Sequence, residues 1–176
     1  MRKMKQLITV LMVILVIKFK SCNGNKKEVC RHSHGKIFCQ EKDLKEIPSN
    51  ILGPGITTLL LYDNQIESTK QLDVHLSMFG NLQVLDMHNN RLNRVPQAPK
   101  SIKKLDLDSN KISRIAKDLN NMRELKVLSL RSNNLNEASF DLNTFSENNQ
   151  MEELNLDYNE LKLLPKNLPL NLKFYR

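Results

Sequence analysis

The 176-residue sequence contains no tryptophan and only five glycines. It has no Gly-rich phosphate or dinucleotide loop, and no G-x-S-x-G or H-E-x-x-H motif. His75 and His88 have no nucleophile placed beside them by a local motif. The sequence therefore does not indicate an enzyme, and we expect no cofactor.

Long hydrophobic runs are also scarce, and the one that stands out is LITVLMVILVI at residues 7–17. These 11 residues follow a basic start, MRKMK, in the pattern of a secretory signal peptide. A membrane-spanning helix needs about 20 apolar residues, so the run is too short for one. We expect a signal peptide over residues 1–24, cleaved after Gly24, with no membrane span in the chain and a secreted product.

The formal charge of +8 shrinks once this segment is removed. The first 24 residues hold five basic side chains and no acid: Arg2, Lys3, Lys5, Lys18 and Lys20. Taking these five from the 27 basic residues leaves 22 against 19 acids, a charge of +3. That value is ordinary for a soluble domain and does not favour nucleic acid as a partner.

Three cysteines are an odd number for a secreted chain. If Cys22 leaves with the signal peptide, Cys30 and Cys39 remain as a pair for one disulfide. An alternative would combine this pair with His32 and His34 as four zinc ligands, at short and irregular spacing. An oxidising compartment favours the disulfide, so we expect no metal.

Internal repetition decides the fold. Five segments match L-x-x-L-x-L-x-x-N-x-L, with Ile or Met in place of some leucines: residues 56–66, 82–92, 102–112, 125–135 and 151–161. Their asparagines are Asn64, Asn90, Asn110, Asn133 and Asn159. The pattern predicts short strands whose leucines point inward, and an asparagine column that satisfies backbone groups where the strands end.

The predicted fold is an α/β solenoid, a right-handed leucine-rich repeat superhelix with a parallel β-sheet on its concave face. Residues 25–55 are predicted to form an N-terminal cysteine-bearing cap that covers the first coil. Residues 56–176 would hold five full repeats and the start of a sixth. No cysteine pair or polar helix follows as a C-terminal cap, so we expect a truncated product or a last coil that a partner covers.

Long and short repeats alternate, and the short ones have the form V-P-Q-A-P-K-S-I-K-K-L (95–105) and L-P-K-N-L-P-L-N-L (164–172). In this respect the chain resembles the small leucine-rich proteoglycans, which implies a matrix protein that binds collagen, growth factors or other matrix components. It departs from that family in its cysteine number and in having no Ser-Gly dipeptide. The spacing C-x8-C also resembles the N-terminal cap of Toll-like receptor ectodomains, so a fragment of a recognition receptor is the alternative.

Partner binding is expected on the outward positions of the concave sheet. The candidates are Tyr62, Asp86, His88, Asp106, Asp108, Arg131, Glu153 and Asp157. Asp86 and Asp106 should be lateral neighbours, where like charges are destabilising. Such tolerated repulsion favours a basic partner, for example a stretch of collagen, although polar residues on this face would also keep an exposed sheet soluble.

Basic residues near the asparagines should line one edge of the solenoid: Arg91, Arg94, Lys111 and Arg114. Charge could hold a sulfated glycosaminoglycan there, with strong dependence on salt. A solvated edge with no ligand explains the same residues.

The segment KLDLDSNKI (104–112) also contains the D-x-D-x-N start of a calcium loop. A loop beginning at Asp106 needs glycine where Lys111 stands and a bidentate glutamate where Lys117 stands. Two lysines at these positions repel the ion. The sequence therefore predicts no calcium loop here.

Overall fold

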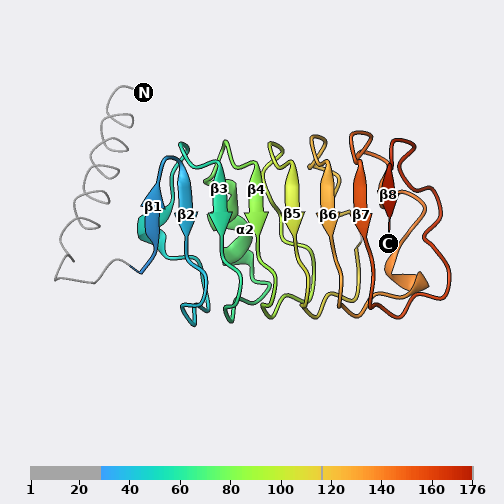
Figure 1. Cartoon of the computed structure of the whole chain (residues 1–176), viewed down its shortest axis with the longest axis horizontal. Helices are drawn as coiled ribbons and strands as arrows, with labels where there is room; N and C mark the ends of the chain where they lie inside the picture. Colours follow the sequence, from blue (N-terminus) through green and yellow to red (C-terminus); the bar gives the residue numbers. More distant parts are fainter. Residues whose placement is uncertain (1–28, 116, 176) are drawn as a thin grey trace, which may run out of the picture.

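The computed structural model describes residues 29–115 and 117–175, in which the strands form one sheet in chain order, β1 to β8 (Figure 1). The strands are β1 Arg31–Ser33, β2 Lys36–Phe38, β3 Thr58–Leu60, β4 Val84–Asp86, β5 Lys104–Asp106, β6 Val127–Ser129, β7 Glu153–Asn155 and β8 Phe174–Tyr175. The predicted signal peptide, residues 1–24, lies outside the described residues.

The repeat strands pair in parallel with the register that the repeat alignment predicts. Leu59 pairs with Leu85, Leu85 with Leu105, and the column continues through Leu128 and Leu154. These central leucines are buried, while the residues on either side of them are half-buried or exposed. The predicted leucine-rich repeat solenoid is confirmed.

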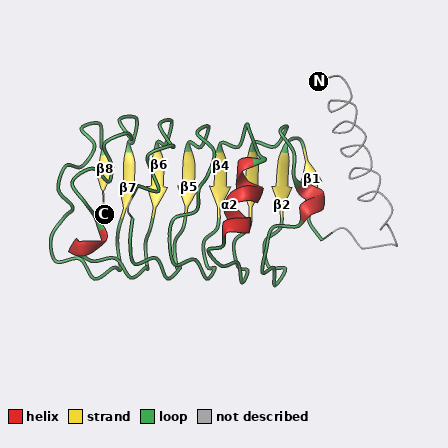
Figure 2. Cartoon of the chain, turned by 180° about the vertical axis from the view of Figure 1, so that it is seen from behind, coloured by secondary structure: helices red, strands yellow, loops and turns green. Residues whose placement is uncertain are grey.

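The return side of each coil is mostly irregular chain rather than helix (Figure 2). Within the described residues, α2 at Lys70–Ser77 is the one α-helix, beside the 3₁₀ turns η1 Ser49–Ile51 and η2 Glu137–Ser139. Helix α2 begins where Thr69 Oγ1 accepts a hydrogen bond from the Leu72 N–H at 3.0 Å. Its buried residues Leu72 and Leu76 face the leucine core, so the helix replaces one loop of the solenoid wall.

The N-terminal cap is an antiparallel hairpin, β1–β2, that covers the first coil by pairing β2 with β3 in parallel. Its turn places His34 at φ 47° and Gly35 at φ 73°, and glycine reaches such angles without strain. Cys30 and Cys39 form the predicted disulfide beneath it, with an S–S length of 2.03 Å. Since the two sulfurs are bonded to each other, the alternative of a zinc site with these cysteines is excluded.

The residue before each repeat asparagine has a left-handed backbone. The φ angles lie between 51° and 55° at Asp63, Asn89, Ser109, Ser132 and Tyr158. Asparagine and aspartate tolerate this conformation better than serine or tyrosine. The turn out of each strand is therefore the same in every coil, although the residues that occupy it tolerate a positive φ to different degrees.

No helix among the described residues is long and apolar enough to cross a membrane.

Candidate partner-binding face

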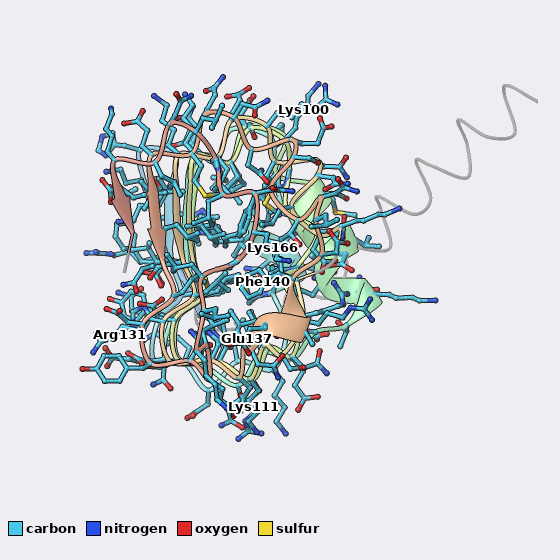
Figure 3. The ribbon with its side chains drawn as sticks, turned by 90° about the vertical axis from the view of Figure 1, so that its right-hand side faces the viewer. Lys100, Lys111, Arg131, Glu137, Phe140 and Lys166 are labelled. Carbon is cyan, nitrogen blue, oxygen red and sulfur yellow. A yellow bond between two sulfur atoms is a disulfide. The ribbon has the colours of Figure 1, made fainter. Side chains whose placement is uncertain are left out.

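The outward residues of β3 to β7, with the residue two positions after each strand, form one surface that we call the sheet face. All eight predicted binding residues lie on it and are half-buried or exposed: Tyr62, Asp86, His88, Asp106, Asp108, Arg131, Glu153 and Asp157. Figure 3 shows Arg131 beside the strands, away from the loops of the return side. The predicted neighbours Asp86 and Asp106 pair directly across β4 and β5.

Both aspartates also terminate their strands. Asp86 Oδ1 accepts a hydrogen bond from the His88 N–H at 3.2 Å, and Asp106 Oδ1 accepts one from the Asp108 N–H at 3.1 Å. Asn155 makes the same bond to the Asp157 N–H at 3.0 Å. A neutral carboxamide serves in this turn as well as a carboxylate does, so the turn does not require the charges of Asp86 and Asp106.

The His88 ring is held between two neighbours. Nδ1 lies 2.8 Å from Asp86 Oδ1, and Tyr62 of the preceding coil stacks on the ring at 4.6 Å between centroids, with 8° between the planes. The side chain of His88 is 36% exposed and that of Asp86 is 21% exposed. The ring is therefore fixed in orientation while its edge stays accessible.

Burial raises the pKa of Asp106 above its ordinary value of 3.8. The hydrogen bond from the Asp108 backbone lowers the pKa, while the nearby carboxylates of Asp108 and Asp86 raise it further. One oxygen of Asp86, one oxygen of Asp106 and one nitrogen of His88 all lie within 4.8 Å of one another. The structure thus concentrates negative charge where the two successive coils of β4 and β5 meet.

Asp108 and Arg131 continue the sheet face toward the C-terminal coils. Asp108 Oδ1 accepts a hydrogen bond from the Arg131 N–H at 2.8 Å, and the Arg131 guanidinium lies 4.6 Å from the ring centre of Tyr158. Tyr158 is 73% exposed and lies outside the set of residues that the strand alternation predicts. The sequence signal for Tyr158 is that it is the one aromatic residue among those that precede the repeat asparagines, where the other coils have Asp, Asn or Ser.

The remaining predicted acids, Glu153 and Asp157, belong to the β7 coil, two strands away from β5. The sheet face therefore has one dense acidic group on β4 and β5 and a separate one on β7, rather than a uniform acidic surface.

Beside this surface, the side chains of the asparagine column form hydrogen bonds that connect consecutive coils. Asn110 Oδ1 accepts from the Leu92 N–H of the preceding coil at 2.9 Å, and its Nδ2 donates to the carbonyls of Met87 and Leu107, each at 3.0 Å. The other four repeat asparagines make the equivalent bonds: Asn64, Asn90, Asn133 and Asn159. This ladder fixes the spacing of the strands, and through it the spacing of the outward side chains.

The four residues of the predicted basic edge do not share one environment. Arg94 lies in a double hydrogen bond with Asp73, with Nη2–Oδ2 at 2.5 Å and Nη1–Oδ1 at 3.3 Å. Arg91 and Arg114 are exposed, and Lys111 lies at the lower edge in Figure 3. Arg91 and Lys111 occupy equivalent positions of consecutive coils, because the N–H of each donates to the coil before it. One of the four predicted basic residues is therefore already engaged within the fold.

Comparison with known proteins agrees with this architecture. A family model described as "Leucine rich repeat" matches residues 100–161, and a second, "Leucine Rich Repeat", matches residues 81–100. The chain is a leucine-rich repeat protein.

Among extracellular relatives, keratocan of Gallus gallus is 30% identical over 161 residues, which is 77% of this chain and 45% of that protein. Oligodendrocyte-myelin glycoprotein of Homo sapiens is 30% identical over 146 residues, or 82% of this chain and 32% of that protein. The chain thus spans less than half the length of these curated relatives. In sequence it is similar to the small leucine-rich proteoglycans and to other leucine-rich repeat proteins.

A solved structure shares both fold and detectable sequence with the chain. It is an octameric complex of Latrophilin 3, Unc5D and the leucine-rich repeat part of FLRT2, matched with a TM-score of 0.70 at 27% identity. The match covers 82% of this chain and 44% of that chain.

Proposed function

We propose that the chain binds an extracellular partner protein through the acidic part of the sheet face, and that a basic stretch of fibrillar collagen is the favoured partner. A protein-interaction role is supported by the relatives, which are non-enzymatic leucine-rich repeat proteins. The collagen assignment rests on the sheet face itself.

The observation that carries the proposal is the pairing of Asp86 with Asp106 on adjacent strands. Their like charges repel each other on adjacent strands. The strand-ending turn does not need these charges, because the neutral Asn155 makes the same turn. A basic side chain of a partner would relieve the repulsion and gain two charge-assisted hydrogen bonds. Tyr62 and His88 add an apolar ring surface beside the acids.

An extended, basic partner also suits the shape of the surface, because the strands of consecutive coils present equivalent positions in a row (Figure 1). The leucine-rich repeat part of FLRT2 is found in a complex with two other proteins, which supports assembly with protein partners for a solenoid of this kind.

Solid-phase binding to fibrillar collagen tests the proposal. The double variant Asp86→Asn/Asp106→Asn keeps the turn-forming acceptor oxygens and removes both charges. We expect it to bind about tenfold more weakly, equivalent to about 1.4 kcal/mol. Binding by the native chain should also weaken as salt is raised.

The matched control is Glu46→Gln/Glu124→Gln, which removes two exposed acids of the connecting segments and should bind collagen as the native chain does. Equal binding by both double variants would remove the acidic pair from the account. Binding of the native chain to a basic growth factor but not to collagen would replace the favoured partner.

A further inference from the structure

The group formed by Asp86, His88 and Asp106 joins two carboxylates to an imidazole. We propose that it is a binding site for a divalent transition metal of the zinc type, with Asp86, His88 and Asp106 as the three protein ligands. The inference goes beyond the proposed function, because it needs no partner protein.

The geometry supports three ligands from two neighbouring coils. One oxygen of each aspartate and one nitrogen of His88 lie within 4.8 Å of one another, and His88 Nδ1 is 2.8 Å from Asp86 Oδ1. A tetrahedral zinc ion, with bonds of about 2.0–2.2 Å, holds its ligand atoms roughly 3.3–3.5 Å apart. Small side-chain rotations at the ends of β4 and β5 bring the three atoms to that separation.

The surroundings hold the ligands in place. Tyr62 stacks on one face of the His88 ring and restricts its rotation. The Asp86 and Asp106 carboxylates each accept a backbone N–H with one oxygen, which orients the group as outer-shell hydrogen bonds orient metal ligands. The asparagine ladder fixes the spacing of the two strands that carry them.

The donor set selects the class of metal. Imidazole suits zinc and its neighbours in the transition series, whereas calcium takes six to eight oxygen ligands and magnesium requires nearly ideal oxygen octahedra. Two carboxylates balance the charge of a divalent ion. Three protein ligands leave a fourth position for water or for a group supplied from outside the chain.

The D-x-D-x-N pattern runs along a single segment of the chain, so it does not indicate a metal site formed by neighbouring coils. The proposed ligands lie instead on two coils: Asp86 and Asp106 end β4 and β5, and His88 follows β4 by two residues. The lysines that exclude the calcium loop are not among them. The third ligand, His88, is not part of that pattern.

Titration of the secreted, chelator-treated chain with Co²⁺, followed by displacement with Zn²⁺, tests the site. We expect one Co²⁺ per chain with a d–d absorption spectrum and no sulfur-to-cobalt charge-transfer band, and loss of the spectrum when Zn²⁺ is added. His88→Gln and Asp106→Asn should each weaken binding at least about tenfold. His34→Gln removes an exposed histidine of the cap and should leave binding unchanged.

A second measurement locates the bound ion in the native chain, without any variant that could misfold. Bound Co²⁺ is paramagnetic, so the backbone NMR signals at the ends of β3, β4 and β5 should shift most. The absence of binding, binding that survives His88→Gln and Asp106→Asn, binding lost in His34→Gln, or a sulfur charge-transfer band would each overturn the proposal. Metal binding without collagen binding would overturn only the proposed function, and the reverse result only the metal site.

Discussion

Asp73 of helix α2 lies in a double hydrogen bond with Arg94, 21 residues further along the chain. Asp73 Oδ1 also accepts the Gln97 N–H at 2.8 Å, and the Asp73 hydrogen bond is the main cause that raises the pKa of Arg94. One carboxylate therefore joins the helix to the next coil through both a side chain and the backbone.

Replacing either partner should destabilise the fold unequally. We expect Asp73→Ala to lower the free energy of unfolding by about 2 kcal/mol, because it removes the acceptor of the Gln97 N–H and leaves the Arg94 guanidinium with backbone carbonyls only. Arg94→Ala should lower it by about 1 kcal/mol, because the bond to Gln97 survives. Urea unfolding of the two variants measures the difference, and equal losses would contradict the shared role of Asp73.

The asparagine column should be the most sensitive polar feature of the fold. Asn110→Ala removes the acceptor of the Leu92 N–H and the donor to two buried carbonyls, so we expect a loss of about 3 kcal/mol. The control Asn134→Ala, at an exposed position next to the column, should change stability by less than about 0.5 kcal/mol. Comparable losses from both variants would mean that the column has no special role.

Glu137 should make the C-terminal coils sensitive to acid. Its Oε1 accepts the Lys162 N–H at 2.6 Å and the Leu163 N–H at 3.1 Å, and backbone hydrogen bonds lower its pKa from the ordinary 4.5. A lowered pKa in the folded state adds stability above pH 4.5, and that stability is lost as the pH falls through the folded value.

The stability advantage of the native chain over Glu137→Gln should therefore be present at pH 6 and disappear with acidification below pH 4.5. Urea unfolding across this range measures it. Glu124→Gln is the control and should track the native chain throughout. An advantage that does not change with pH would show that the carboxylate charge is not involved.

Asp106 should behave in the opposite way. Because its pKa is raised above 3.8, ionising it disfavours the folded state, and stability is lost as the pH rises through the folded value. In the presence of a chelator, Asp106→Asn should be more stable than the native chain at neutral pH and should lose that advantage below pH 3.8. A variant less stable at neutral pH would contradict the cost of burying this ionised carboxylate beside Asp86 and Asp108.

The left-handed turn residues offer a stabilising change. Ser109 has φ 52°, and Asn89 occupies the equivalent position of the preceding coil. We expect Ser109→Asn to raise the free energy of unfolding by about 0.5 kcal/mol, because asparagine adopts this conformation more easily. Urea unfolding measures the gain. The control Ser113→Asn, at a position without positive φ, should give none.

Much of the fold could be predicted from the sequence, because the repeat spacing alone sets the strand register. Leu59, Leu85 and Leu105 each occupy the same place in the motif, and stacking pairs them directly. The helix α2 could not be predicted in this way, since it lies in the variable part of a long repeat where no periodic leucines guide the assignment.

The candidate site was predicted only in part. Alternation along each strand placed Asp86 and Asp106 outward and side by side, as the structure has them. The stack of Tyr62 on His88 and the contact of Arg131 with Tyr158 depend on side-chain rotamers across neighbouring coils. A one-dimensional repeat pattern contains no information about those rotamers. The sequence pattern also gives no indication that Asp86 accepts the turn-forming hydrogen bond from the His88 N–H, because its charge points to binding instead.

The asparagine ladder has a consequence for how the chain folds. The hydrogen bonds between coils join residues of neighbouring coils, such as Asn110 and Leu92, which are 18 residues apart. Each of these bonds can therefore form before distant parts of the chain are in place. Loop closure over such short distances is entropically modest. A coil can dock onto its predecessor as soon as it emerges during synthesis, and the chain can assemble in the order in which it is made, with the disulfide-closed cap as the first template.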